Sequence, residues 1–319
     1  MKILWIILGV LAGLCVLGGV LVFLIGFVRA FRVQDMFKNE DVESVVARNR
    51  DAIRRGCEIL ENAPHEEIHI RAFDGVELYA TYFPAPDDAP NKGRGTILAV
   101  HGFRSQNPYT DIGLGAVRFL ADGWDVLIPC LRGHGKSSGK CMGFAFLDRH
   151  DIAAWCHWLD KNKAPRCIIL DGVSMGGGSV LMACGEDLPK SVRGVIADCG
   201  FTSAWQEMLH LSDRVFHFRA YPVFWVTSLL CKLFLGEGLF SCDTRDIMKK
   251  NTIPVFFAHG KDDNYVPWRM SVENHDACAA KKWLFLVEGA GHGESYLVDG
   301  DGYREGLKEF FAVCEGEVK

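Results

Sequence analysis

The sequence lacks the cysteine and histidine spacing of a structural metal site. None of its 12 cysteines forms a Cys-x-x-Cys pair, and no cysteine and histidine cluster has zinc-site spacing. Several cysteines lie within apolar runs, as Cys167 does before residues 168–170, where a free thiol behaves as a small buried hydrophobic group. We therefore expect no metal and reduced thiols, which favour a cytosolic location for the domain.

The chain also lacks a basic stripe, internal repeats and low-complexity tracts. Its formal net charge is only -5, so composition gives no reason to expect nucleic-acid binding. Apolar residues make up 49% of the 319 residues and charged residues 24%, which predicts a packed core and excludes global disorder. One large α/β domain with a small additional element fits this length.

Charged residues are absent from Ile3 to Val28. A helix of that length can cross a hydrocarbon core of about 30 Å with some tilt. We expect residues 1–30 to form a transmembrane anchor. A cleaved signal peptide would have a shorter apolar region and a small-residue cleavage site, and a lipoprotein signal at Cys15 would need a small residue where Leu14 stands.

The flanking charges indicate an orientation for this anchor. Lys2 and the amino terminus lie on one side, and Arg29, Arg32 and Lys38 lie on the other. The positive-inside rule therefore places the C-terminal domain in the cytoplasm, as the reduced thiols also suggest. The predicted location is a single-pass membrane protein with a cytoplasmic domain.

The remainder of the chain alternates short apolar runs with helical patterns. Residues 31–62 are expected to form a helical linker, because residues 40–62 read as an amphipathic helix, and residues 63–319 form the main domain. Strands are expected in eight runs: 66–73, 76–83, 96–100, 124–129, 167–170, 192–197, 254–258 and 283–287. The alternation predicts a mostly parallel sheet with helices on both faces, entered through a hairpin at Asp74-Gly75.

One interval, residues 201–250, has no clear strand and is rich in aromatic residues. A structureless loop of that length is uncommon, so we expect two or three helices that form a cap beside the sheet. The aromatic side chains could roof an apolar pocket or pack the cap onto the body of the domain, and the sequence leaves both roles open.

The strongest chemical signal is the run 172–176, which reads Gly-Val-Ser-Met-Gly after a buried-strand pattern and before a helix start. A serine on such a sharp turn projects its hydroxyl from the sheet, and flanking glycines avoid side-chain clashes. The N-terminus of the following helix favours developing negative charge. Ser174 is therefore the predicted nucleophile.

The oxyanion hole is expected between two loops. A second strand, residues 97–100, ends in His101-Gly102-Phe103. With a serine on such a turn, one N–H comes from the residue after the nucleophile and the other from the loop after an earlier strand. These are the backbone N–H groups of Met175 and Phe103. His101 itself is expected to be a buried structural histidine.

The base should follow the nucleophile late in the chain. His292 stands in a glycine-flanked loop after the last predicted strand, and a neutral imidazole there can accept the serine proton. The acid has three candidates at strand ends: Asp262, Asp263 and Asp198.

Four motifs together resemble the serine-hydrolase branch of the α/β-hydrolase superfamily, with esterase-like, lysophospholipase-like and cinnamoyl-esterase-like proteins that carry a small helical cap as the nearest likeness. They are His101-Gly102-Phe103; the run 132–137, Arg-Gly-His-Gly-Lys-Ser; the run 172–176; and the run 259–267, His-Gly-Lys-Asp-Asp-Asn-Tyr-Val-Pro, followed by Gly291-His292. The resemblance covers about residues 66–313 and leaves residues 1–62 outside. It implies the α/β-hydrolase fold, Asp263 as the acid, a mainly structural 132–137 turn, and no metal or organic cofactor.

The expected function is hydrolysis of a carboxylic ester, small-molecule or lipid-like, through an acyl-enzyme on Ser174. Thioesterase or protein-deacylase activity, acyl transfer and peptide hydrolysis use the same catalytic groups and stay open. A catalytically silent binding module would not need all four groups, and halide or epoxide cleavage would need a carboxylate in place of Ser174. The sequence identifies neither the substrate nor the oligomeric state.

Overall fold

The computed structural model describes residues 1–28, 47–103, 105 and 107–316. Part of the predicted linker, residues 31–46, and the predicted cytoplasmic flank Arg29, Arg32 and Lys38 lie outside the described residues.

An eight-stranded sheet forms the centre of the molecule, with the strand order β1-β2-β4-β3-β5-β6-β7-β8. β2 is antiparallel to both β1 and β4, and the other neighbouring strands are parallel, as the sequence predicted. The strands are β1 Glu66–Arg71, β2 Glu77–Phe83, β3 Thr96–Val100, β4 Asp125–Cys130, β5 Ile168–Val173, β6 Val192–Asp198, β7 Val255–Gly260 and β8 Lys282–Val287.

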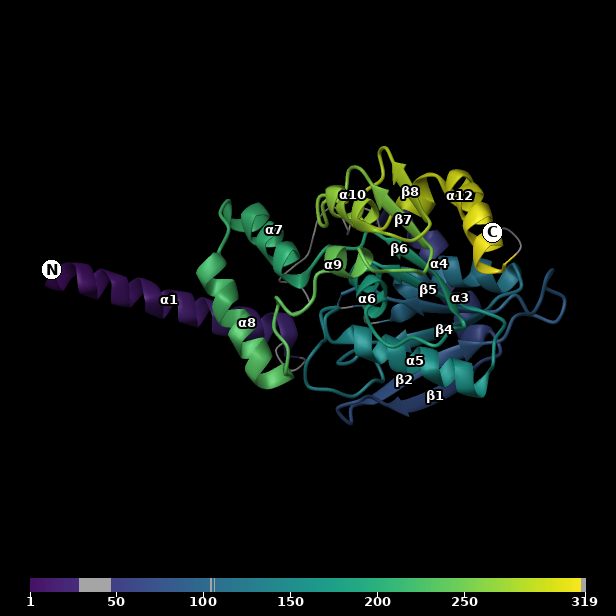
Figure 1. Ribbon diagram of the computed structural model, residues 1–319, viewed down its shortest axis with the longest axis horizontal. Coiled ribbons are helices and arrows are strands. Elements are labelled where there is room, and N and C mark those ends of the chain that lie inside the picture. The colour runs from purple at the N-terminus through teal and green to yellow at the C-terminus, as the bar shows by residue number, and fades with distance from the viewer. Residues whose placement is uncertain (29–46, 104, 106, 317–319) are drawn as a thin grey trace.

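Helices cover both faces of this sheet (Figure 1). One face packs against α4 (Pro108–Ala121) and α12 (Gly300–Cys314), and the other against α5 (Asp148–Asn162), α6 (Met175–Ala183) and α10 (Trp268–Ala277). The period of two along the strands explains this division, because Ile97 and Ala99 face the first layer while Leu98 and Val100 face the second. The fully buried strands account for the continuous apolar runs of the sequence.

The segment that the sequence treats as a linker contributes to the body of the domain. Helix α3 (Arg50–Asn62) packs along α4. Gly56 lies against the backbone of Gly113, where an added side chain would meet its carbonyl carbon at 3.3 Å, and Leu60 is fully buried. α3 is therefore a packed layer of the fold over its described length.

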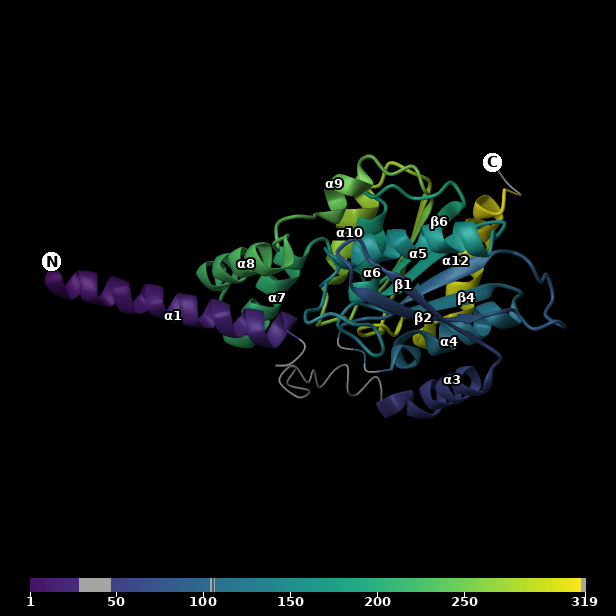
Figure 2. The same cartoon turned by 90° about the horizontal axis from the view of Figure 1, so that it is seen from below.

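Three helices occupy the interval 201–250: α7 (Ala204–Phe216), α8 (Tyr221–Leu235) and α9 (Thr244–Met248). α9 packs on α6 and α10, close to the sheet. α7 and α8 project from the body, and α8 lies beside the long N-terminal helix α1 (Lys2–Phe27), as both ribbon views show (Figures 1 and 2). α1 is the one helix among the described residues that is long and apolar enough to cross a membrane.

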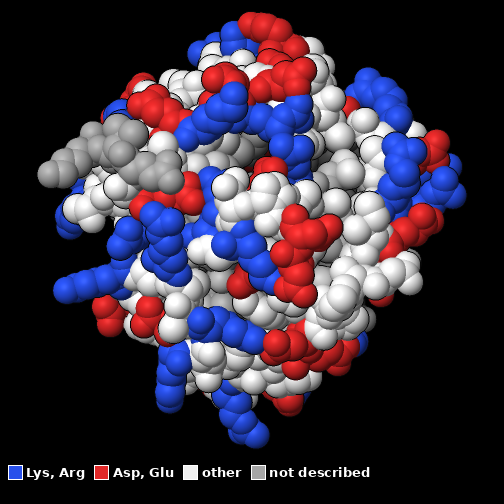
Figure 3. Space-filling view, turned by 90° about the vertical axis from the view of Figure 1, so that its right-hand side faces the viewer, with Lys and Arg blue, Asp and Glu red and all other residues white. Residues whose placement is uncertain are grey.

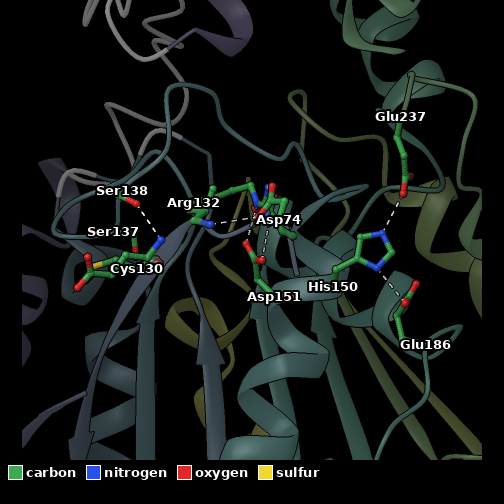
Figure 4. Close-up of polar contacts among 12 residues, drawn as sticks. Asp74, Cys130, Arg132, Ser137, Ser138, His150, Asp151, Glu186 and Glu237 are labelled. Carbon is green, nitrogen blue, oxygen red and sulfur yellow. Dashed lines mark hydrogen bonds and ion pairs between the residues drawn. The ribbon is translucent and has the colours of Figure 1, made fainter. Parts of the chain in front are cut away.

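Charged side chains tie the end of the α7–α8 segment to the body (Figure 4). His150 lies between two carboxylates, with Nδ1 at 2.9 Å from Glu186 and Nε2 at 2.8 Å from Glu237. Arg149 donates to the same two carboxylates at 2.7 and 3.0 Å. Since Glu237 follows α8 and the others belong to the body, this cluster fixes where α8 returns to the domain.

The turn after β4 is held by a buried arginine (Figure 4). Arg132 donates to both carboxylate oxygens of Asp151 at 2.6 and 2.7 Å and to Asp74 at 2.7 Å. A buried guanidinium needs such paired acceptors to offset its desolvation. Ser137 donates to the Cys130 carbonyl at 2.6 Å in the same turn. These contacts hold the turn in place, so the 132–137 run has the structural role that the resemblance implied.

Candidate functional site

Ser174 stands on a strained turn between β5 and α6. Its backbone has φ 58° and ψ −118°, a region that residues other than glycine rarely adopt. The two glycines of the motif allow the turn, because a side chain at Gly172 would meet the Gly176 carbonyl oxygen at 2.3 Å and one at Gly176 would meet that of Val100 at 2.2 Å. The sharp turn places the serine hydroxyl at the carboxyl edge of the sheet.

The structure brings together the three side chains that the sequence nominated. His292 Nε2 lies 2.8 Å from Ser174 Oγ, and His292 Nδ1 lies 2.7 Å from Asp263 Oδ2. Ser174 follows β5, Asp263 follows β7 and His292 follows β8, so parallel strands deliver all three to one edge. With Nδ1–H donating to the carboxylate, Nε2 is left to accept the serine proton.

Asp263 is fixed from four directions. Its Oδ1 accepts the backbone N–H groups of Tyr265 and Val266 at 2.8 and 2.9 Å, and its Oδ2 faces His292 and also His259 Nε2 at 3.0 Å. Burial alone would raise the pKa of Asp263, but the two histidines outweigh it and hold that pKa well below its ordinary value. The carboxylate therefore stays ionised throughout the neutral range.

The environment of His292 favours its charged form. Burial opposes protonation, but the Asp263 carboxylate outweighs burial and raises the pKa of His292 well above its ordinary value of 6.5. Cys199 is fully buried and has a positive φ of 44°. This neighbour of the base gave no motif in the sequence, because its contact with His292 depends on the pairing of β6 with β7.

The other candidates have different partners. The Asp198 side chain accepts from the Ser295 hydroxyl at 3.1 Å, while its backbone carbonyl accepts the Ser174 N–H at 2.9 Å. Asp262 is exposed and its amide donates to the Ala290 carbonyl. His101 is fully buried, with Nδ1 2.8 Å from the Gly102 carbonyl oxygen and Nε2 accepting the Leu131 N–H at 3.0 Å.

The loop after β3 lies against the nucleophile. A side chain added at Gly102 would meet Ser174 Cβ at 3.4 Å, and the Gly102 N–H donates to Asp111 Oδ2 at 2.9 Å. Phe103 and Met175, the residues expected to supply the two oxyanion-hole N–H groups, both line the pocket that contains Ser174. Asp111, which fixes this loop from α4, had no signal in the sequence.

Comparison with known proteins bears on the fold. A family model described as the alpha/beta hydrolase fold matches residues 95–225. The uncharacterized protein YqkD of Bacillus subtilis is 27% identical over 290 residues, which cover 91% of this chain and 92% of YqkD. The uncharacterized protein YfhR of Escherichia coli strain K12 is 26% identical over 249 residues, 77% of this chain and 80% of YfhR.

Solved structures show the same fold. The esterase Pf2001 of Pyrococcus furiosus superposes with a TM-score of 0.60 at 20% identity, over 78% of this chain and 92% of the esterase. Est1E of Butyrivibrio proteoclasticus with bound ferulic acid gives a TM-score of 0.57 at 20% identity, over 76% of this chain and 97% of Est1E. This chain has the α/β-hydrolase fold. The expected fold is confirmed.

The pocket at Ser174 is small and mainly apolar. Its lining residues come from the nucleophile turn, the loops after β3, β4, β6 and β7, and helix α7: Phe103, Phe144, Ser174, Met175, Phe201, Glu207, Leu211, Tyr265 and Val266. Of the aromatic side chains in the interval 201–250, Phe201 alone belongs to this described lining. Trp205 instead packs against Phe240, with 4.0 Å between ring centroids.

Glu207 is the unexpected member of the lining. Its side chain is only 2% exposed, and neither carboxylate oxygen has a hydrogen-bond partner within the described part of the chain. Burial, with a smaller contribution from the Asp263 charge, raises the pKa of Glu207 to about 8. A protonated, unpaired carboxyl group thus faces the space above Ser174 at neutral pH. The sequence gave no sign of it, because a single glutamate in a helix normally faces solvent.

One group of described residues has metal-ligand geometry. Ligand atoms of Cys199, Asp263 and His292 lie within 4.8 Å of one another. Two of these side chains already hold each other and Ser174, and burial raises the pKa of Cys199 to about 11, so its thiol stays protonated at neutral pH. These side chains therefore fit the activation of a serine by a histidine and an aspartate better than the binding of a metal ion.

Proposed function

We propose that this chain is a membrane-anchored serine hydrolase that cleaves a carboxylic ester through Ser174, His292 and Asp263. The observation that carries the proposal is the unbroken hydrogen-bonded row from Ser174 Oγ through His292 to Asp263 at a strained strand-to-helix turn. Such strain persists only where surrounding structure maintains it, and it is typical of a nucleophile.

The reaction proceeds in two acyl-transfer steps. His292 Nε2 takes the proton of Ser174 Oγ as that oxygen attacks the ester carbonyl, and the charged imidazole is stabilised by Asp263. The N–H groups of Phe103 and Met175 stabilise the oxyanion. The imidazole then protonates the leaving alcohol, and an acyl-enzyme remains. Water, deprotonated by His292, releases the acid and restores the serine.

Two further findings support ester hydrolysis at a membrane. Pf2001 is an esterase, and Est1E was solved with ferulic acid bound. Phe23 and Phe27 of α1 are buried in the core of the folded domain, which favours a retained anchor over a cleaved signal peptide. Residues 1–30 would then be the anchor, residues 63–319 the hydrolase domain and about 201–250 its cap. All 12 cysteines are described and carry free thiols, in keeping with a cytoplasmic domain.

The test is labelling with a fluorophosphonate probe, which reacts with an activated serine. The full-length protein is compared with Ser174→Ala and with Ser241→Ala, an exposed serine that serves as the matched control. We expect labelling of the intact protein and of Ser241→Ala, and none of Ser174→Ala. Nitrophenyl esters of increasing chain length then report substrate preference, with a rate loss of at least about 1,000-fold in Ser174→Ala.

A folded intact protein that resists the probe would contradict a preformed nucleophile. Labelling without ester turnover, but with turnover of an acyl thioester, would redirect the proposal to thioester cleavage. Transfer of the acyl group to an added alcohol in preference to water would redirect it to acyl transfer.

A further inference from the structure

The exposed part of α1 is shorter than the hydrocarbon core of a bilayer. Its side chains are mainly exposed over residues 1–17, while Gly19, Phe23, Gly26 and Phe27 are buried. Seventeen residues span about 25 Å along a helix, against about 30 Å of hydrocarbon. A bilayer crossed by α1 therefore extends past residue 17, to the level at which α1 packs against α8.

The contact between α1 and α8 holds α8 at the height of residues 19–23 of α1. A side chain at Gly19 would meet Val226 Cβ at 2.5 Å, so the two helices touch backbone to side chain without spare room. The Thr227 hydroxyl donates to the Gly19 carbonyl at 3.2 Å, and the ring centroids of Phe23 and Phe234 lie 5.6 Å apart. α8 therefore shares whatever environment surrounds this part of α1.

The outward face of α8 and the α7–α8 turn are apolar. Trp225, Leu229 and Leu233 follow one another at four-residue spacing and are 59%, 56% and 68% exposed. Phe216 and Phe218 at the turn are 62% and 58% exposed. A soluble surface rarely exposes so much contiguous apolar area, and tryptophan and phenylalanine are typical of helices that lie in a membrane interface.

The charged side chains of the α7–α8 segment also favour contact with a membrane surface. Between residues 211 and 235 the charged side chains are three basic ones, Arg214, Arg219 and Lys232, and one acidic one, Asp213. A net positive, apolar segment suits a surface with anionic lipid headgroups. The opposite end of the molecule, turned away from α1, carries interspersed charges of both signs over its surface (Figure 3).

Aromatic rings lead from this surface to the pocket. Phe23 stacks with Phe27 at 6.1 Å, and Phe27 contacts Phe144 at 5.5 Å between ring centroids. Phe144 in turn lies 5.3 Å from Phe103 and 5.8 Å from Phe201, and these three rings line the pocket with Ser174. The end of α1 is also fixed there, because the Met142 N–H donates to the Phe27 carbonyl at 2.8 Å.

We propose that the α7–α8 hairpin lies in the lipid–water boundary beside α1, and that the Ser174 pocket takes its ester from the bilayer. The substrate class is an amphiphilic ester that resides in the membrane, and the apolar surface formed by the α7–α8 turn and the outer face of α8 contacts acyl chains. This inference rests on the proposed function, in that α1 is the anchor and Ser174 the nucleophile.

The position of the hairpin is tested in the full-length protein in phosphatidylcholine and phosphatidylglycerol nanodiscs. The eight tryptophans are replaced biosynthetically by 5-fluorotryptophan, and Trp225→Phe, Trp5→Phe and Trp158→Phe assign their fluorine resonances. Lipid with a spin label near the acyl carbonyl should broaden the Trp225 resonance. The resonance of Trp158, in α5 on the body, should stay sharp.

Trp5 lies in the exposed part of α1, so its resonance tests the membrane anchor separately from the hairpin placement. A second lipid, labelled near the chain end, should broaden the Trp5 resonance if α1 crosses the bilayer. Broadening of Trp5 without Trp225 would overturn the hairpin placement and leave the anchor standing. Absence of both effects would overturn the anchor as well. A sharp Trp225 resonance that shifts with protein concentration would assign the apolar face to a second copy of the chain and overturn the proposal.

Delivery of substrate is tested with the double variant Leu229→Glu/Leu233→Glu and the control Ile59→Glu, an exposed residue of α3. Hydrolysis of a fluorogenic ester lipid in vesicles should fall by about tenfold or more in the double variant, since each leucine would otherwise be buried in lipid. Hydrolysis of water-soluble nitrophenyl acetate should not change, and the control should match the parent on both substrates. Equal losses on both substrates, or none, would overturn delivery from the bilayer.

A parent that hydrolyses neither ester would refute the proposed activity, while the fluorine spectra would still decide the hairpin placement.

Discussion

Glu207 offers a quantitative test of the electrostatics above Ser174. Its carboxyl group is buried, unpaired within the described structure and carries a pKa of about 8, against an ordinary value of 4.5. Between these two pH values the unfolded chain has lost the proton and the folded protein keeps it. The folded state then binds more protons than the unfolded state, so stability falls as pH rises through this window.

The magnitude follows from the pKa difference. One pKa unit corresponds to about 1.4 kcal/mol, so the interval from 4.5 to pH 7 costs the folded state roughly 3 kcal/mol. Glu207→Gln has a similar size, remains neutral and does not incur this cost. We expect the variant to equal the parent near pH 4.5 and to be more stable by roughly 3 kcal/mol at pH 7, or about 6 °C in Tm for a domain of this size.

The assay is thermal unfolding in nanodiscs from pH 5 to pH 8 for the parent, Glu207→Gln and Glu305→Gln. Glu305 is exposed on α12 and serves as the control. The Tm difference between the parent and Glu207→Gln should widen steadily with pH, and the control should run parallel to the parent. A constant difference across this range would refute the raised pKa, and a less stable Gln variant at pH 7 would show that Glu207 has a partner in the folded protein.

Three further outcomes follow from the site. Asp263→Asn should lower kcat by about 10,000-fold, measured on a soluble ester, because the amide favours the wrong imidazole tautomer; a loss under tenfold would contradict the assigned acid. Because neutral His292 is the working base and its pKa is raised, kcat/KM should fall as pH drops, with the midpoint above 6.5; a midpoint below that value would contradict the direction of the shift. Asp111→Ala should release the Gly102 loop and therefore lower kcat more than it changes KM. Asp111→Asn still accepts the Gly102 N–H and should retain most of kcat. Equal losses of kcat in the two variants would exclude a positioning role for Asp111.

The sheet was predictable because most strands contain a short apolar run and the runs are separated by turn residues. The predicted strand at 96–100 matches β3, while β5 and β7 extend to Val173 and Gly260, beyond the apolar runs that marked them. Those extensions carry the chain to the site edge. The sequence could mark where a strand is buried but not how far its hydrogen-bonded ladder continues, because the ladder depends on the neighbouring strand.

The Ser174, Asp263 and His292 cluster was predictable from motifs of fixed spacing, whereas the residues that support it were not. His259 contacts Asp263 from within the same motif, so its spacing of four residues was a usable signal. Cys199, Asp111 and Glu207 reach the site from β6, α4 and α7 through tertiary packing. No local pattern encodes those distances, since each depends on how separate layers pack against the sheet.

The close contact of Gly19 with Val226 bears on how a water-soluble form of this protein could be made. Deleting residues 1–28 would do more than detach a tether, because Val223 and Val226 of α8 would lose the surface that covers them. The fold of the α7–α8 segment and the solubility of the truncated protein would then depend on detergent or on self-association. Polar replacements at these two valines, made together with the outward leucines, would be the minimum redesign for a soluble catalytic domain.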